Sequence, residues 1–401
     1  MRVYFAPDTS DHPNWGCRVM GRWFPAALAR AGAPAPWRLG SQWFYRRHRA
    51  LSELGTLADF HRYAGEVRAG RILPKLAAKL QACDLVYLNG ENFIRPGTHK
   101  GRKLLFLAYL VKTLFNKPCI LSNHSVDLAE PELEEIVREI YPQLDEVHFR
   151  EQTSVDQGAR FVTAGRWRLI PDVAWAVPAK PIRDWGETLF RTCKVRAGRG
   201  AAAGFDPARP YITVCGSSMF GQVKHGGRGI VDAFITLCQR LNKEVCAVVL
   251  AAPDEPDLKL MRKVQAVLGL PLLGLDLPVR QAINIIGNAT VHVGGRWHPG
   301  IFAATGGTPW VAFSANNHKV HSLVQQMGLD APVFDVLQLG NHLDEIIALV
   351  QAHAAAGTEL RRKIRDRSHE LAAQVDGNMD FVRRQTGNVS CQKALSQTGN
   401  L

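Results

Sequence analysis

Arg296 and His298 are the residues whose types and spacing best suit chemistry on an anionic substrate. They are two positions apart, they follow the apolar run 290–294, which predicts a strand, and they precede Pro299, which suits the first turn of a helix. Arginine presents a planar fork to a carboxylate or phosphate, and histidine transfers protons near neutral pH. Gly295 beside them permits close approach of the backbone to a ligand. The alternative is structural, with a surface arginine and a histidine that caps the helix.

Three more charged side chains follow predicted strands. Lys319 stands near the start of a predicted helix, where the helix dipole favours anions. Arg150 ends a strand of the first half of the chain, and Glu91 directly follows another strand in a glycine-flanked turn. Glu91 is therefore a candidate general base for a sugar hydroxyl. The plainer alternatives are a surface lysine, an arginine paired with Glu151 and an exposed loop acid.

Two loops between a predicted strand and a predicted helix contain glycine and basic residues. The first predicts a cradle for a donor phosphate, although a flexible basic loop is the alternative, and consists of Gly216, Ser217, Ser218, Lys224 and Arg228. The second opens the first helix of the chain, on the acceptor side, with Asn14, Gly16 and Arg18. A single glycine makes this second loop the weaker signal.

Short apolar runs alternate with longer helical patterns, which predicts parallel α/β units. We predict two doubly wound α/β domains with a cleft between them, where ligands bind beyond the carboxyl ends of the strands. The predicted parts are an N-terminal domain (1–177), a linker or insertion (178–210), a C-terminal domain (211–340), C-terminal helices (341–376) and a polar tail (377–401).

Composition narrows the classes of partner. The 401 residues include 49 Lys and Arg against 36 Asp and Glu, a net charge of +13, which indicates an anionic partner. No apolar run approaches the ~20 residues of a membrane span, and the N-terminus lacks the apolar core of a signal peptide. The 8 scattered cysteines fit reduced thiols, so a cytoplasmic location is expected. No metal-binding motif is present, so a metal-independent mechanism is the expectation.

The basic charge is uneven, with ten arginines against three acids between Arg18 and Arg71. Tryptophan, phenylalanine and tyrosine are interleaved with them. A solvated basic face is one interpretation, and a docking surface for acidic lipid headgroups at the inner face of the cell membrane is the other. Nucleic acid is the least supported partner, because no recognition-helix spacing or RNA-binding motif accompanies the arginines.

In an ordered set of short motifs the sequence resembles the polysaccharide pyruvyl transferase family. The motifs are Asn14-x-Gly16, Phe149-Arg150-Glu151-x-x-Ser154, Ile170-Pro-Asp172, Gly294-Gly-Arg296-x-His298 and Asn317-x-Lys319. The resemblance implies a GT-B-like arrangement of two Rossmann-like domains, with no metal or cofactor. It also implies transfer of a pyruvyl group from phosphoenolpyruvate onto a sugar of a bacterial capsule or exopolysaccharide, or of its lipid-linked precursor. By position, Arg150, Arg296 and Lys319 would hold the donor's phosphate and carboxylate, and His298 would protonate its methylene carbon.

A metal-independent glycosyltransferase is the alternative enzyme. It would transfer an acidic ulosonic sugar from a CMP donor, with Glu91 as base and His298 bound to the donor's phosphate or carboxylate. The loop from Gly216 to Arg228 would then hold the nucleotide. A carbohydrate-binding protein without catalytic activity is the third possibility, in which replacing His298 would leave ligand affinity intact.

Overall fold

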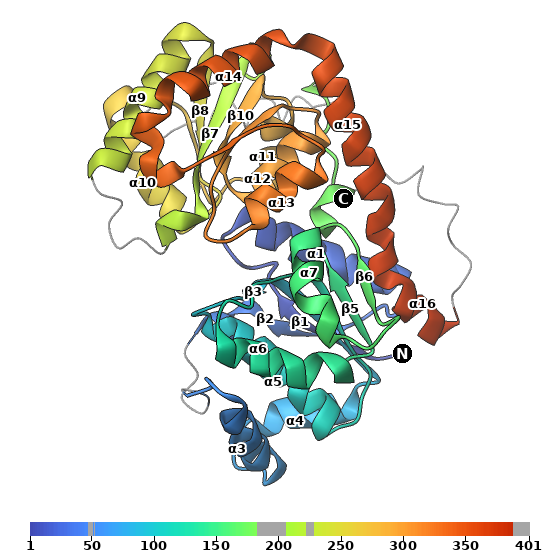
Figure 1. Cartoon of the computed structure of the whole chain (residues 1–401). Helices are drawn as coiled ribbons and strands as arrows, with labels where there is room; N and C mark the ends of the chain where they lie inside the picture. The colour runs from blue at the N-terminus through green and yellow to red at the C-terminus, as the bar shows by residue number, and fades with distance from the viewer. Residues whose placement is uncertain (47–50, 52, 183–205, 222–227, 388–401) are drawn as a thin grey trace. The chain divides into compact units, whose positions relative to one another are not determined.

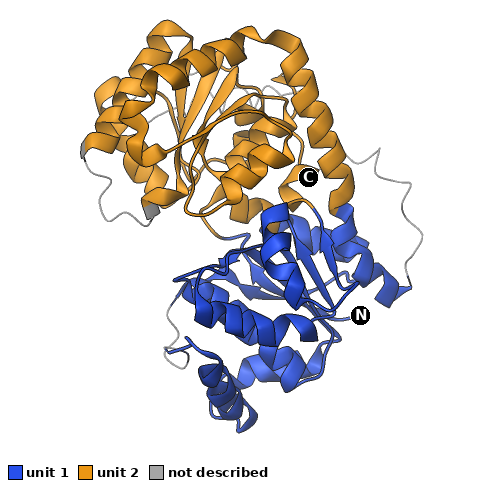
Figure 2. Cartoon of the chain, viewed as in Figure 1, with its two compact units in different colours: residues 1–11, 21–170, 376–401 blue, residues 12–20, 171–375 orange. Residues whose placement is uncertain are grey.

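The computed structural model describes residues 1–46, 51, 53–182, 206–221 and 228–387. The chain forms two compact units, each with its own sheet (Figures 1 and 2). Unit 1 comprises residues 1–11, 21–170 and 376–401, and unit 2 comprises residues 12–20 and 171–375. Both are described below separately.

Unit 1 contains a six-stranded parallel sheet in the order β2-β1-β3-β4-β5-β6. The central strands are buried at nearly every position, as expected where helices cover both faces of a parallel sheet, and polar side chains follow their apolar first residues. The strands are β1 Val3–Asp8, β2 Trp37–Gly40, β3 Leu85–Ile94, β4 Cys119–Val126, β5 Glu146–Phe149 and β6 Trp167–Leu169.

The helices of unit 1 bury an apolar stripe against this sheet. In α6 the buried residues Leu133, Ile136, Val137 and Ile140 recur at the spacing that places them on one helix face. The helices are α2 Ser41–Tyr45, α3 Leu57–Arg68, α4 Pro74–Ala82, α5 His99–Thr113, α6 Pro131–Ile140, α7 Gln152–Gly158 and α16 Asp380–Thr386, and α1 Trp15–Arg30 runs from unit 2 into unit 1.

Unit 2 repeats the architecture with a six-stranded parallel sheet in the order β12-β11-β10-β7-β8-β9. The strands are β7 Tyr211–Ser217, β8 Ala247–Ala251, β9 Leu272–Leu273, β10 Val291–Gly295, β11 Trp310–Phe313 and β12 Val333–Phe334. The helices are α9 Arg228–Glu244, α10 Glu255–Leu268, α11 Val279–Gly287, α12 Trp297–Thr305, α13 Lys319–Gln326, α14 Leu343–Ala355 and α15 Gly357–Gln374. The predicted fold class, two Rossmann-like α/β halves, is confirmed.

The units differ from the predicted domain boundaries in three places. Residues 12–20 belong to unit 2, where the amide of Trp15 donates to the carbonyl of Pro253 (3.1 Å). Residues 171–177 also belong to unit 2, and the predicted linker lies mostly outside the described residues.

The third difference is in the predicted polar tail, which includes α16 and belongs to unit 1. There Tyr87 Oη donates to the carbonyl of Asn378 (2.7 Å), and Val382 is fully buried. The described part of the tail, up to residue 387, therefore packs on unit 1. Across the part of the chain that the structure describes, no helix is both long and apolar enough to cross a membrane.

Candidate active site

The predicted site residues of unit 2 lie at the carboxyl ends of three neighbouring strands, β7, β10 and β11. Parallel strands bring these ends to one edge of the sheet. Gly216 and Ser217 end β7, Gly295 ends β10, and Lys319 begins the helix after β11. The structure thus brings together in unit 2 most of the residues that the sequence predicted for a donor site.

A bulge at the end of β10 directs the chain toward Arg296 and His298. The register between β10 and β7 shifts between Val293 and Gly295. Gly294 has a φ of +156°, and a Cβ atom there would lie 2.3 Å from Cys215 Sγ. Only glycine fits this conformation and this close approach, and β-bulges commonly re-aim side chains beside active sites.

His298 lies in the first turn of α12 between Gly16 and Asp172. A Cβ atom at position 16 would lie 1.9 Å from Nδ1 of His298, so the imidazole packs directly on the glycine backbone. On its other side, His298 Nε2 is 3.6 Å from Oδ2 of Asp172. Asn14 fixes this segment, because its Oδ1 accepts a hydrogen bond from the amide of Cys17 (3.2 Å) and so caps α1.

Asp172 is a residue to which the sequence analysis gave no role. It is fully buried, and its carboxylate accepts hydrogen bonds from the amide of Ala174 (2.9 Å) and from Nε1 of Trp297 (3.1 Å). These bonds fix the orientation of the carboxylate beside His298. The available signal was the motif Ile170-Pro-Asp172, which does not reveal its partner 126 positions away in sequence.

Arg296 is held by two carboxylates that the sequence analysis also missed. Its Nη2 is 2.7 Å from Oδ2 of Asp257, and its Nη1 donates to Oδ2 of Asp254 (3.3 Å). Asp254 caps α10, and Asp257 lies in the first turn of that helix. Arg296 is only 9% exposed, so the pair fixes the direction of its guanidinium.

Asp257 also contacts the end of β7, since a Cβ atom at Gly216 would lie 2.4 Å from its Oδ1. Burial raises the pKa of Asp257 to about 7, although Arg296 acts to lower it. Asp257 therefore changes its charge near neutral pH in the folded protein.

The contribution of Asp257 to stability is expected to decrease as the pH rises from about 4 to about 7. The folded state holds the proton to a higher pH than the unfolded chain, so ionisation costs folding free energy over this range. Asp257→Asn should flatten that part of the pH profile of the unfolding free energy, measured by urea denaturation. Asp366→Asn, at an exposed position of α15, is the control, and equal pH slopes for wild type and Asp257→Asn would contradict the assignment.

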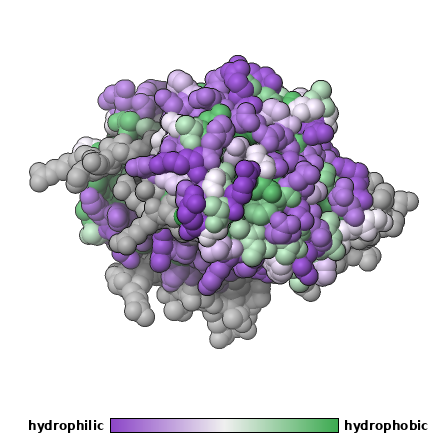
Figure 3. All heavy atoms as spheres, turned by 90° about the horizontal axis from the view of Figure 1, so that it is seen from below, coloured by the Kyte–Doolittle hydropathy of each residue, from purple (hydrophilic) through white to green (hydrophobic). Residues whose placement is uncertain are grey.

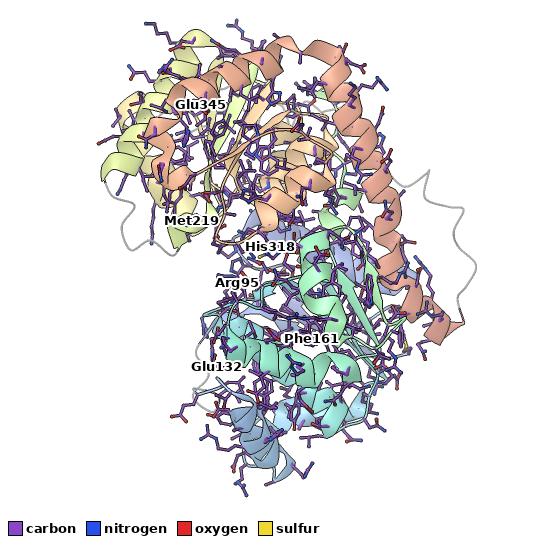
Figure 4. The ribbon with its side chains drawn as sticks, viewed as in Figure 1. Arg95, Glu132, Phe161, Met219, His318 and Glu345 are labelled. Carbon is purple, nitrogen blue, oxygen red and sulfur yellow. The ribbon has the colours of Figure 1, made fainter. Side chains whose placement is uncertain are left out.

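Ser218 and Lys319 converge on Asn316. Ser218 Oγ and Lys319 Nζ both donate to Oδ1 of Asn316, at 3.0 Å and 3.1 Å. Figure 4 shows their neighbours, Met219 and His318, at the same end of unit 2. Lys319 is 7% exposed, which leaves its ammonium group partly desolvated and strengthens its attraction for an anion.

Some of the remaining predicted donor and acceptor residues lie outside the described part of the chain, and others belong to a different unit from the one predicted. Lys224 lies outside the described residues, as does the side chain of Arg228, the first residue of α9. The acceptor-side prediction for Asn14, Gly16 and Arg18 placed them in the N-terminal domain, but they belong to unit 2. Arg18 Nη2 there donates to the carbonyl of Leu275 (2.8 Å).

In unit 1, Glu91 is held in a buried polar cluster. It is 5% exposed and has a φ of +48°, an unusual conformation for a non-glycine residue. Thr9 Oγ1 and Asn89 Nδ2 both donate to its Oε1, at 3.0 Å and 3.4 Å. Strained, hydrogen-bonded carboxylates are typical of functional sites, so Glu91 stays a candidate base.

Arg150, also in unit 1, is almost fully buried and contacts polar side chains. Its Nε donates to Ser125 Oγ (2.9 Å) and lies 3.7 Å from Oε2 of Glu151. The pairing with Glu151 that the sequence left open is therefore present. Arg150 stays a predicted donor ligand, and the structure adds that its guanidinium is anchored by these neighbours.

The chain belongs to the polysaccharide pyruvyl transferase family, whose model matches residues 30–317. No curated protein sequence matches it significantly. Among solved structures it is similar to the spinosyn rhamnosyltransferase SpnG, with a TM-score of 0.52, 13% identity and coverage of 96% of this chain and 100% of that one. It is also similar to the S. aureus MnaA–UDP co-structure, with a TM-score of 0.55, 9% identity and coverage of 96% and 94%. At such identities the likeness concerns the fold, which is that of GT-B proteins. The protein is a transferase.

Proposed function

We propose that this protein transfers a pyruvyl group from phosphoenolpyruvate onto a sugar of a bacterial surface polysaccharide or of its lipid-linked precursor. The observation that carries the proposal is the pairing of His298 with the buried Asp172, beside the fixed guanidinium of Arg296. A proton donor next to an oriented cation is what an anionic enol ester requires. Membership of the pyruvyl transferase family supports the same conclusion.

The donor would bind through positive charge and backbone amides rather than through a metal or cofactor. Arg296 and Lys319 supply the cations of unit 2, and the turn at Gly216–Ser218 supplies amide and hydroxyl groups. Arg150 is the third proposed cation. Fixed charges of this kind stabilise a small polyanion without reorganisation during the reaction.

In the proposed reaction His298 gives its proton to the methylene carbon of phosphoenolpyruvate, which becomes a methyl group. The carbon that carries the phosphate becomes an oxocarbenium-like centre, and a sugar hydroxyl attacks it. Inorganic phosphate then leaves and a second hydroxyl of the same sugar closes the ketal. The hydroxyl protons return to the histidine or to solvent. Asp172, beside the ring, would help to hold the imidazole in position for the first transfer.

Partners and location are part of the proposal. The acceptor would be a saccharide, free in a polymer or carried on a lipid, and nucleic acid is not a proposed partner. The cysteines in the described part of the chain are free thiols, which supports a cytoplasmic location.

Glycosyl transfer from a CMP-activated acidic sugar is the second candidate, and the geometry of Glu91 favours it. A buried carboxylate hydrogen-bonded to Thr9 and Asn89 is a suitable base for an acceptor hydroxyl. In that reaction His298 and Arg296 would bind the donor's anionic groups and perform no proton transfer to carbon.

Ligand-induced thermal stabilisation distinguishes the two functions. We expect phosphoenolpyruvate to raise the unfolding temperature, since a ligand at about 100 times its Kd adds roughly 2.7 kcal/mol. CMP, UDP and GDP should have little effect. Arg296→Gln should abolish the shift, and Arg262→Gln, at an exposed position of α10, should not. Stabilisation by CMP and none by phosphoenolpyruvate would contradict pyruvyl transfer.

A further inference from the structure

Helix α4 of unit 1 lies between two apolar grooves with cationic edges. One groove, of about 480 Å³, is lined by Leu39, Trp43, Leu73 and Leu76, with Lys75 and Lys79 at its edge. The other, of about 330 Å³, is lined by Val67, Leu114 and Phe115, with Arg68 at its edge. Seen from below, the protein also has hydrophobic side chains gathered in patches among hydrophilic ones (Figure 3). One face of unit 1 thus combines apolar recesses with positive charge.

The cations beside α4 differ from those arginines of the Arg18–Arg71 cluster that pair with carboxylates. Lys75 and Lys79, one helical turn apart, and Arg68 are all exposed, and none forms an ion pair with a carboxylate among the described residues. Their charge is therefore available to an external anion. We call Arg68, Lys75 and Lys79 the α4 cations.

Three arginines of the predicted cluster are instead paired with carboxylates, whereas the exposed Arg22, Arg30 and Arg46 form no ion pair among the described residues. Arg38 pairs with Asp8 (3.4 Å), Arg62 pairs with Glu53 and Asp59, and Arg71 pairs with Glu66. Arg18 belongs to unit 2, and Arg47 and Arg49 lie outside the described residues. The region of α4 is distinguished from these arginines because its unpaired cations line grooves with apolar side chains.

Trp43 lines the larger groove, and its backbone carbonyl accepts a hydrogen bond from the buried Lys103. Lys103 Nζ donates to the carbonyls of Trp43 (3.0 Å) and Phe44 (3.4 Å) at the end of α2. Desolvation lowers the pKa of Lys103 to about 8. Tryptophan is typical of membrane–water interfaces, because its ring is apolar and its N–H is polar.

We propose that the face around α4 docks on an anionic membrane surface. The α4 cations would contact lipid phosphates, and the two grooves with Trp43 would meet the boundary between headgroups and acyl chains. Charge complementarity selects this occupant, because neutral lipid would leave three exposed cations without partners. The proposal is independent of the donor chemistry.

Cosedimentation with vesicles tests this inference on the full chain. Wild type should bind vesicles of phosphatidylcholine with phosphatidylglycerol and should bind pure phosphatidylcholine weakly. Lys75→Gln with Lys79→Gln should weaken binding by roughly 30-fold, since each basic residue near such a surface contributes about 1 kcal/mol. The matched control is Lys259→Gln with Lys263→Gln, an exposed lysine pair of the same spacing on α10, which should bind within about twofold of wild type.

Trp43→Ala tests the apolar part and should reduce the binding that persists at high salt, where the lysine contribution is screened. Equal binding to both vesicle types would overturn the proposal, and so would undiminished binding of the α4 lysine variant. An equal loss of binding in the control pair would also overturn it, because binding would then depend on the net charge of the protein and not on the position of the lysines. The α4 substitutions are at exposed positions, so folding is not at risk.

Discussion

Replacement of His298 by glutamine is expected to lower the turnover of phosphoenolpyruvate by roughly 10²–10⁴-fold, the usual contribution of a positioned general acid. The affinity for phosphoenolpyruvate should change little, because the charges that bind it belong to Arg296, Lys319 and Arg150. Turnover is measured as release of inorganic phosphate in the presence of saccharide acceptors. Binding is measured separately by calorimetry.

His369→Gln is the matched control, at an exposed position of α15 in the same unit, and should retain full activity. Asp172→Asn should give a smaller loss than His298→Gln, because it changes the carboxylate beside the imidazole and leaves the proton donor itself in place. An active His298→Gln variant would show that this histidine is not the acid. Lost binding with unchanged kcat would assign it to ligand binding instead.

Gly16→Ala is expected to lower kcat by about 10²-fold or more, although the substitution adds only a methyl group. That methyl would lie 1.9 Å from His298 Nδ1, so the imidazole must move away from its position beside Asp172. Displacement of a catalytic group by about 1 Å costs on the order of 10²-fold in rate. The kcat values of Gly16→Ala and wild type are compared at equal saturation with phosphoenolpyruvate.

Gly340→Ala serves as the control, since nothing lies within 4 Å of a Cβ atom at that exposed position of unit 2. It should leave both rate and stability unchanged. If Gly16→Ala retains the activity of wild type, the contact between Gly16 and His298 is not part of the catalytic arrangement.

Much of the fold could be predicted because parallel strands buried on both faces have a clear sequence pattern. The segments 85–89 and 119–123 were expected as strands, and they form part of β3 and β4. Polar residues directly after such strands converge at one sheet edge. This is why Arg296, Lys319 and Ser218 were predicted together and are found in one unit.

The partners of the site residues could not be predicted, because no local spacing encodes them. Trp297 and Asp172 are 125 positions apart, and Arg296 and Asp254 are 42 apart. In the sequence, Asp254 and Asp257 resemble ordinary acidic residues at the start of a helix, which the positive end of the helix dipole stabilises. Their second role, holding Arg296, depends on the sheet order that places β10 next to β7, the strand on which α10 packs.

The membership of residues 12–20 in unit 2 could not be predicted for the same reason, because it depends on long-range contacts. Sequence order placed this loop with the first strand and predicted that a helix follows from Arg18, whereas α1 begins earlier, at Trp15. The contacts of Trp15 with Pro253 and of Gly16 with His298 are long-range. A single glycine is a weak signal in the sequence. The structural reason for glycine at position 16 is the imidazole of His298, which leaves no room for a Cβ atom there.

The most direct test of pyruvyl transfer is the position of deuterium in the product of a reaction run in D₂O. The protein is incubated with phosphoenolpyruvate and a panel of methyl glycosides of hexoses and N-acetylhexosamines, and products are analysed by mass spectrometry and NMR. Because the His298 proton exchanges with solvent, the account predicts a pyruvate ketal with a single deuteron in its methyl group, and no ketal with His298→Gln. A parallel incubation replaces phosphoenolpyruvate with a CMP-activated acidic sugar. Consumption of that sugar, while phosphoenolpyruvate stays intact with every acceptor, would contradict the account.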